Sequence, residues 1–285
     1  MLGAKAASNE SGRVGSRPGR LQRSQQGGAT IDVIDVRKRY DAKGGSIEAI
    51  QSISTRIEAE EFVSIVGPSG CGKTTLLFMI AGLEQPSGGK VLVNDTPVVA
   101  PVKDVGVVFQ RDLLLEWRTC LENVLLQFEM RGVKVTKSDR DNAHSLLASV
   151  GMHDFADRRP RQLSGGMRQR VSICRALVHQ PPLVLMDEPF GALDALTREE
   201  LNSELERITR QTTATVVFVT HSIEEAVHLS DRVLVMSPRP SRIVADVRIA
   251  LERPRSTAVR EDEAFASHVA EIRRHLVDSG GISRA

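Results

Sequence analysis

Aromatic side chains are scarce in this chain. Its 285 residues include 8 Phe, 1 Tyr and 1 Trp, too few for the stacking platforms with which proteins hold single-stranded nucleic acids. The net charge is only +2, from 38 basic and 36 acidic residues, so no strong positive field attracts a polyanion. We therefore expect no nucleic-acid partner, and the positions of the single tyrosine and single tryptophan become informative.

Cysteines and long apolar runs are also few. Cys71, Cys120 and Cys174 are odd in number and lack metal-ligand spacing, which argues against a disulfide framework and a zinc site and fits a reducing cytoplasm. The longest apolar stretches, such as Val63–Val66 and Leu183–Met186, fall far short of the ~20 residues that a membrane-spanning helix needs. We expect no membrane span.

Basic residues are concentrated at the N-terminus. Residues 1–28 contain one acid and five basic residues among Gly, Ser and Gln, which leaves the rest of the chain slightly acidic. Such a segment cannot bury enough apolar surface to offset the entropy of ordering it. We predict a disordered basic leader, with a transit peptide or an arm that binds anionic lipid as alternatives.

Short apolar runs alternate with helical segments in the rest of the chain. Alternating apolar and polar residues predict half-exposed, antiparallel strands over Ile31–Val36, Ile47–Ile57 and Lys90–Asn94. Wholly apolar runs predict buried strands over Phe62–Val66, Val105–Phe109, Leu183–Met186 and Ala214–Val219, with Val233–Met236 as the last strand. Helices are expected between them, over Thr74–Ala81 and about Thr197–Arg210. This alternation is typical of an α/β fold with a mostly parallel core sheet.

Three segments follow from these patterns. The leader spans 1–28, the main domain 29–250 and a C-terminal helical extension 251–285. Helical segments broken near Gly132, Gly151 and Pro160 indicate a helical subdomain at about 115–180. In the extension, Phe265, Val269, Ile272 and Leu276 share one helical face, which predicts a packing helix; a regulatory or partner-binding helix is the alternative.

A glycine-rich loop separates the predicted strand Phe62–Val66 from the helix after it. Its sequence, Gly-Pro-Ser-Gly-Cys-Gly-Lys-Thr, fits the phosphate-loop pattern Gly-x-x-x-x-Gly-Lys-Ser/Thr in the required context. The glycines let backbone N–H groups converge on phosphate oxygens, and the helix N-terminus adds a positive dipole end. Lys73 is placed to reach the β- and γ-phosphates, Thr74 to bind Mg²⁺, and Cys71 is a small filler. The predicted nucleotide-binding residues here are Gly67, Pro68, Ser69, Gly70, Cys71, Gly72, Lys73, Thr74 and Thr75.

Two acids directly follow the apolar run Leu183–Met186. Ligands of open parallel sheets bind at the carboxyl ends of the strands, where Asp187 and Glu188 are expected to lie. Asp187 is predicted to hold the Mg²⁺ shell, and Glu188 to polarise an attacking water.

A second motif distinguishes among phosphate-loop proteins. Residues 163–170 are Leu-Ser-Gly-Gly-Met-Arg-Gln-Arg, and Ser-Gly-Gly before a helix offers another anion-binding N-terminus. The run matches the signature of ABC ATPases, and the chain resembles that family from about Ile31 to Ile243. The resemblance implies a P-loop NTPase fold, ATP and Mg²⁺ as ligands, and hydrolysis of ATP to ADP and phosphate.

The resemblance assigns roles to residues elsewhere in the chain. Gln110 matches the loop glutamine that contacts Mg²⁺ and senses a membrane partner, and His221 matches the histidine at the γ-phosphate, catalytic together with Glu188. Tyr40 stands where the family stacks an aromatic ring on adenine, and Asp194 ends the loop that pairs across a dimer. In this family two copies sandwich two ATP molecules head to tail, so each nucleotide also faces the other copy's Ser164, Gly165 and Gly166. A homodimer is therefore expected.

The segment after Gln110 resembles the ATPases of importers for nitrate, sulfonates and taurine. Those ATPases typically have Leu-Leu-Pro-Trp where this chain has Leu-Leu-Glu-Trp, ending at Trp117, and Glu116 is a departure that weakens assignment to one solute. The resemblance implies integral-membrane permease subunits, an indirect partner in a periplasmic or extracellular solute-binding protein, and a peripheral location on the cytoplasmic face of the cell membrane. An exporter or non-transport ABC ATPase, or a P-loop small-molecule kinase, is the alternative.

Overall fold

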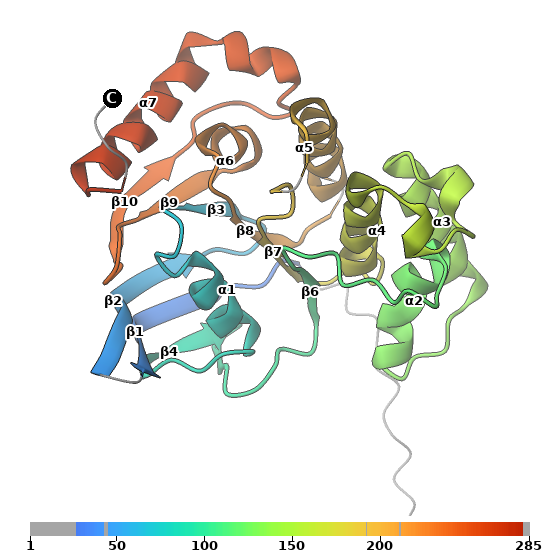
Figure 1. The fold of residues 1–285 in the computed structure, drawn as a ribbon, viewed down its shortest axis with the longest axis horizontal. Coiled ribbons are helices and arrows are strands. Elements are labelled where there is room, and N and C mark those ends of the chain that lie inside the picture. Colours follow the sequence, from blue (N-terminus) through green and yellow to red (C-terminus); the bar gives the residue numbers. More distant parts are fainter. Residues whose placement is uncertain (1–26, 43–44, 192, 211, 282–285) are drawn as a thin grey trace, which may run out of the picture.

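Two β-sheets organise the part of the chain that the computed structural model describes, residues 27–42, 45–191, 193–210 and 212–281 (Figure 1). Most of the predicted basic leader lies outside these residues, as does Ala192.

The larger sheet has six strands in the order β10-β9-β3-β8-β7-β6. Five of them run parallel, and β10 pairs antiparallel with β9 at one edge. β3, β7 and β8 are buried along their whole length, as expected for strands covered on both faces. The bounds are β3 Phe62–Val66, β6 Val105–Val108, β7 Leu183–Asp187, β8 Thr215–Val219, β9 Arg232–Met236 and β10 Ile243–Arg248.

The predicted parallel core sheet is confirmed, but Val233–Met236 is not its last strand. β10 follows it, and all its residues except Val247 are half-exposed or exposed. Its pattern is weak because one side of an edge strand has no neighbouring strand, and its register is set by pairing with β9 rather than by its own apolar residues.

The smaller sheet is antiparallel, in the order β2-β1-β4-β5. Helix α1 lies between the two sheets, and its Leu77 packs in one apolar cluster with Ile53 of the small sheet and Val217 of the large one. The bounds are β1 Ile31–Ala42, β2 Gly45–Ile57, β4 Gly88–Val93, β5 Thr96–Pro97 and α1 Lys73–Ala81. α1 ends at Gly82, whose φ of 74° is the left-handed geometry of a helix C-cap.

Helices α2, α3 and α4 form a separate block beside β6 and β7 (Figure 1, right). Thr119 and Thr136 begin α2 and α3 with complete capping boxes. Gly132 and Gly151, with φ of 66° and 69°, separate the helices where the sequence predicted breaks. The bounds are α2 Cys120–Met130, α3 Lys137–Ser149, η1 His153–Phe155, η2 Pro160–Gln162 and α4 Gly165–Leu177.

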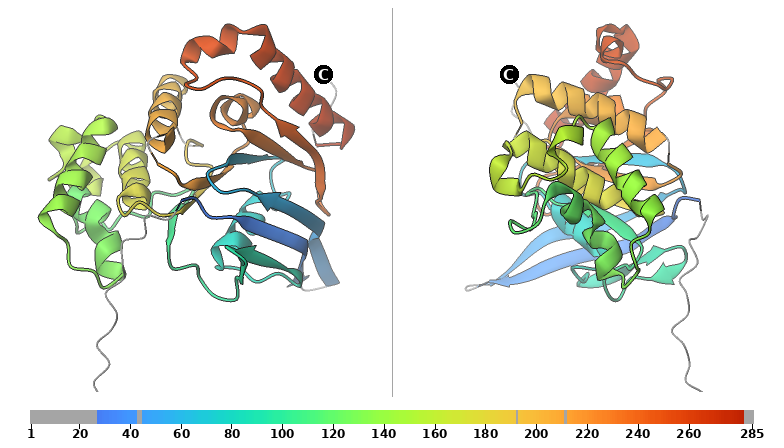
Figure 2. Two further views of the ribbon diagram at one scale, coloured as in Figure 1. Left: turned by 180° about the vertical axis from the view of Figure 1, so that it is seen from behind. Right: turned by 90° about the vertical axis from the view of Figure 1, so that its right-hand side faces the viewer.

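The remaining helices, α5, α6 and α7, cover the face of the large sheet that points away from α1 (Figure 2). The predicted C-terminal packing helix is confirmed as α7, which buries Phe265, Ile272 and Leu276 in a cluster with residues of α6, β9 and β10. Just past α7, a Cβ built on Gly281 would lie 3.4 Å from Cδ of Pro68, so this end of the chain touches the phosphate loop. The bounds are α5 Ala195–Arg210, α6 Ile223–Leu229, η3 Thr257–Glu261 and α7 Glu263–Asp278. No helix among the described residues is both long enough and apolar enough to span a membrane.

Candidate functional site

The phosphate loop joins the buried strand β3 to helix α1. Gly70 and Gly72 have φ angles of 75° and 109°, a backbone geometry that glycine adopts without the steric cost of a Cβ. Lys73 is only 5% exposed, and its Nζ donates hydrogen bonds to the carbonyl oxygens of Gly67 at 3.0 Å and Pro68 at 3.3 Å. The loop thus curls around an ammonium group, the arrangement that binds nucleotide phosphates in phosphate-loop proteins.

Cys71 lies inside the same loop as a packing residue. Its thiol is free and its side chain buried, and burial raises the pKa of the thiol. A thiol with a raised pKa is a poor nucleophile at neutral pH, in keeping with the filler role. The neighbouring Ser69 is exposed at the surface of the loop.

Asp187 ends strand β7 directly beside the first turn of α1. The hydroxyl of Thr74 donates a hydrogen bond to its Oδ1 at 2.9 Å. Burial raises the pKa of the Asp187 carboxyl, and the hydrogen bond from Thr74 opposes that shift. Two of the three predicted Mg²⁺ ligands, Thr74 and Asp187, are therefore in direct contact although they are 113 residues apart in sequence. The third, Gln110, contacts Glu188 instead.

Three other predicted site residues surround the carboxylate of Glu188. Lys73 Nζ lies 3.7 Å from Oε1, Gln110 Nε2 donates a hydrogen bond to Oε2 at 3.4 Å, and His221 Nδ1 lies 3.5 Å from the same Oε2. Glu188 itself has a φ of 43°, an uncommon conformation for a non-glycine residue that costs about 1–3 kcal/mol and occurs often at active sites. The Glu188 carboxylate, just after β7, thus lies among side chains from the start of α1 and from the segments that follow β6 and β8.

Tyr40, on β1, lies at the edge of the phosphate-loop helix. Its hydroxyl is 3.3 Å from Oγ1 of Thr75, and the Nζ of Lys38 lies 4.9 Å from the ring centroid. The residue is 39% exposed, so part of the ring remains open to a planar ligand next to the loop.

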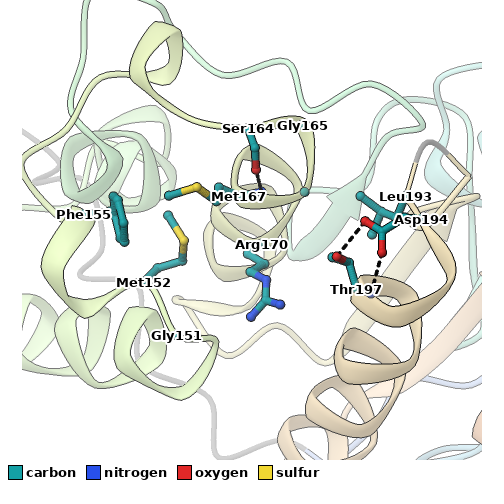
Figure 3. A pocket seen from close by; sticks show the side chains of 11 residues that line it. Gly151, Met152, Phe155, Ser164, Gly165, Met167, Arg170, Leu193, Asp194 and Thr197 are labelled. Atoms are coloured by element: carbon teal, nitrogen blue, oxygen red, sulfur yellow. Dashed lines mark hydrogen bonds between the residues drawn. The ribbon is translucent and has the colours of Figure 1, made fainter.

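The signature residues lie apart from this cluster, at the start of α4. Ser164 caps that helix by accepting a hydrogen bond from the Met167 N–H at 3.3 Å, and Gly165 and Gly166 follow it. Asp194 caps α5 in the same way, accepting bonds from the N–H and hydroxyl of Thr197 at 3.0 and 2.8 Å. Both caps line one open pocket of 510 Å³, and Figure 3 shows the Arg170 side chain projecting beside them in the same pocket. No phosphate-loop residue lines this pocket, so the structure brings Ser164, Gly165, Gly166 and Asp194 together but not with Lys73.

Arg239 is a neighbour of the phosphate loop that the sequence did not reveal. Its Nε donates a hydrogen bond to the carbonyl oxygen of Gly70, and a Cβ on Gly70 would lie 2.9 Å from its Nη2. The Ser-Pro-Arg-Pro stretch around Arg239 was the available signal, but nothing in the sequence connects it with a loop 169 residues away.

Two arginines of the signature helix hold the loop that follows Gln110. Arg168 pairs with Asp112 at 2.9 Å, and Arg175 donates to the carbonyl oxygens of Asp112 and Leu113, both at 2.7 Å. Because these contacts join α4 to the residues after Gln110, the signature helix and the glutamine loop are expected to move together.

The donor set around Thr74 suits a hard cation. The Thr74 hydroxyl and the Asp187 carboxylate lie together, and Gln110 contacts Glu188, the residue after Asp187. Mg²⁺ prefers oxygen ligands of these kinds and keeps several waters. Among the described residues no cluster of three His, Cys, Asp or Glu side chains could hold a metal by itself. The donors present therefore fit Mg²⁺ that is also bound by phosphates.

A phosphate loop after a buried parallel strand, with an acid pair ending a second strand of the sheet, defines a P-loop nucleotide-binding protein. A family model described as "ABC transporter" matches residues 50–191. An ABC transporter ATP-binding protein of Methanocaldococcus jannaschii is 48% identical, with 85% of this chain and 90% of the relative covered. A taurine import ATP-binding protein of Rhizobium johnstonii is 45% identical, over 82% of this chain and 90% of the relative.

A solved ATP-binding cassette, described as dimeric and in a post-hydrolysis state bound to ADP and Pi, superposes with a TM-score of 0.70. It is 32% identical, and the match covers 78% of this chain and 100% of that one. With two relatives above 40% identity over nine-tenths of their length, the family is clear. The chain belongs to the ABC transporter family, and its fold is that of the ABC ATPases.

Proposed function

We propose that this chain is the subunit that binds and hydrolyses ATP to energise an ABC importer for a small solute. The observation that carries the proposal is the convergence of Lys73, Gln110 and His221 on the carboxylate of Glu188 beside the phosphate loop. The relatedness to a taurine import ATP-binding protein supports the importer class. The proposed solute is taurine or a similar small anion-bearing molecule, such as another sulfonate or nitrate.

In the proposed reaction, the loop N–H groups and Lys73 bind the β- and γ-phosphates of ATP, and the Tyr40 ring stacks on adenine. Thr74, Gln110 and Asp187 would hold Mg²⁺, which when bound would neutralise charge on the phosphate oxygens. Glu188 orients the attacking water and accepts its proton, while His221 contacts the γ-phosphate. The products are ADP and phosphate.

Each copy of the chain supplies half of a complete site. The phosphate loop and the pocket of Ser164, Gly165 and Gly166 are separate within one chain, so two copies placed head to tail complete two sites with two sandwiched ATP molecules. The dimeric state described for the related cassette supports this arrangement.

An apolar groove offers a docking site for integral-membrane permease subunits. It has a volume of 310 Å³ and is lined in part by Leu83, Leu113 and Met130, all of which are exposed. Trp117, 70% exposed, lies in the same loop as Leu113. Because this loop begins at Gln110, a permease bound here is coupled to the nucleotide site. The chain is thus proposed to act at the cytoplasmic face of the membrane, with a solute-binding protein as an indirect partner.

Reconstitution tests the proposal. The chain is combined in liposomes with the permease subunits and the solute-binding protein of a taurine-type importer, and phosphate release and solute uptake are measured together. We expect ATP hydrolysis to rise when the binding protein carries its solute, and uptake to require ATP. Lys73→Ala should abolish both, while the exposed control Lys103→Ala should not. Hydrolysis that ignores the loaded binding protein, or net efflux of solute, contradicts an importer.

A further inference from the structure

The backbone next to His221 is held by a buried hydroxyl. Thr220, which precedes His221, is 1% exposed. Its Oγ1 donates a hydrogen bond to Glu225 Oε2 at 2.5 Å and accepts one from the Ser222 N–H at 3.0 Å. Its own N–H donates to the carbonyl oxygen of Ile65 on β3 at 3.2 Å. The direction in which the histidine leaves β8 therefore depends on the contacts of Thr220.

Glu225 is an unusual partner for this hydroxyl because its carboxylate is buried. It lies on the first turn of α6 and is 5% exposed, and a buried carboxylate is costly unless it is paired. Its second oxygen, Oε1, faces the Nε of Arg198 on α5 at 3.6 Å. Glu225 thus connects Thr220 to a different helix.

Arg198 in turn holds the loop that contains Asp194. Its Nη2 donates to the Leu193 carbonyl oxygen at 3.0 Å, and its backbone N–H donates to the Asp194 carbonyl oxygen at 3.0 Å. Its Nε is buried and has no hydrogen bond within the part of the chain that the structure describes. Since charge-assisted N–H···O bonds are about 2.7–2.9 Å long, a displacement of about 1 Å would turn the 3.6 Å approach to Glu225 into a full hydrogen bond.

We propose that Glu225 is a positioning residue that links the Asp194 loop to His221 through Arg198 and Thr220. The inference rests on the proposed ATPase function. When a second copy contacts the Leu193–Asp194 loop, Arg198 moves with that loop and closes on Glu225, and Thr220 then fixes His221 beside Glu188. Contact with the partner across the dimer thereby prepares the chain's own ATP site for hydrolysis.

The first test compares three single variants. Glu225→Gln keeps an acceptor for Thr220 but removes the charge that attracts Arg198; Thr220→Val removes the hydroxyl; Arg198→Gln removes the cation. Each should lower the kcat of ATP hydrolysis about tenfold while KM and ATP affinity stay within about twofold, because the groups act on the step after binding. Thr220→Ser keeps the hydroxyl, so its kcat should lie close to that of the unmodified chain and well above that of Thr220→Val.

Glu224→Gln is the matched control. It removes the same charge one position earlier on α6, where Glu224 pairs at 3.5 Å with Arg273 and not with Thr220. Its kcat should equal that of the unmodified chain. An equal fall in both variants would show that any charge change on α6 lowers turnover, and would overturn the proposal.

A double variant separates positioning from general damage. If Glu225 acts only through His221, adding Glu225→Gln to His221→Ala should lower kcat no further, because coupled residues are not additive. A further tenfold loss in the double variant contradicts the linkage, as does full kcat in Glu225→Gln. If Glu225→Gln does not fold, the kcat of Thr220→Val is compared with that of Thr220→Ser. A lower kcat in Thr220→Val alone supports the linkage, and equal kcat values contradict it. Absence of ATP hydrolysis in the unmodified chain would instead refute the proposed function, so the two failures are distinct.

Discussion

At the scale of single residues, Glu188 is the point where the site's charges meet. Its carboxylate lies near one ammonium, one amide and one imidazole, and its backbone has a positive φ. These contacts fix the direction of the carboxylate, as the role proposed for Glu188 in orienting the attacking water requires.

Replacing Glu188 by Gln should trap an ATP-bound dimer. The amide keeps the size of the side chain but cannot accept the proton of the attacking water, so phosphate release should fall at least about a hundredfold. Size-exclusion chromatography with ATP should show a stable dimer. Glu252→Gln, at an exposed position, is the control and should turn over normally. A monomer with full turnover would refute the assigned role.

His228 predicts a pH dependence of stability. The residue is 1% exposed, and burial, aided by nearby Arg260, lowers its pKa from 6.5 to about 4. The unfolded chain therefore binds a proton between about pH 6.5 and 4 that the folded chain does not, so stability falls as the pH drops through that window. From this histidine we expect a loss of about 2 kcal/mol between pH 7.5 and pH 5.

Urea unfolding of His228→Leu measures this contribution. The variant should lose less stability on acidification than the unmodified chain, by that amount. The exposed His144 gives the control variant, His144→Gln, whose pH profile should be unchanged. Identical profiles for all three chains would exclude the assignment.

At the scale of elements, α7 is part of the fold rather than an appendage. Its apolar stripe shares a cluster with α6, and α6 begins two residues after His221. Ile272 is fully buried, so Ile272→Ala should lower the free energy of unfolding by about 2–5 kcal/mol. The exposed Arg274 of the same helix, changed to Ala, should alter it by less than about 0.5 kcal/mol. Equal denaturation midpoints would mean that α7 does not contribute to the core.

The elements that sequence could predict are those with strong local signals. β3, β7 and β8 were recognisable because parallel strands covered on both faces are continuous apolar runs, and α1 because a glycine stops it. β10 was missed because its pairing with β9, not its own composition, makes Ile243–Arg248 a strand.

Some residues of the candidate site could likewise be recognised from the sequence, and others could not. Lys73, Thr74, Asp187 and Glu188 carry motifs whose chemistry requires those residue types, so the motifs could be recognised from sequence. Arg239 and Glu225 carry no motif, and their roles depend on contacts that only the folded chain creates.

At the scale of the whole molecule, the phosphate loop and the pocket of Ser164, Gly165 and Gly166 lie apart in one chain. Ser164→Arg should leave ATP binding by the single chain intact but prevent dimerisation, because the added side chain blocks the partner's nucleotide. In a mixed dimer with Lys73→Ala, the added Arg faces a loop that binds no nucleotide, so the two variants can pair and form one intact site. With random pairing in an equal mixture, half of the dimers are mixed, and about a quarter of the normal ATPase rate should return. A mixture no more active than its components contradicts the head-to-tail arrangement.

Because the phosphate loop and the signature pocket lie apart in one chain, a complete site is proposed to need two copies. The rate of ATP hydrolysis should then depend on chain concentration. For the free chain well below its dimerisation constant, the active species grows with the square of concentration, so a twofold dilution should slow hydrolysis about fourfold. In the proposed transporter, two copies bound to one membrane complex would experience an effective concentration in the millimolar range, so their rate should no longer depend on how much chain is present. If the proposed dimer is the active species, unassembled copies at low concentration should therefore hydrolyse little ATP.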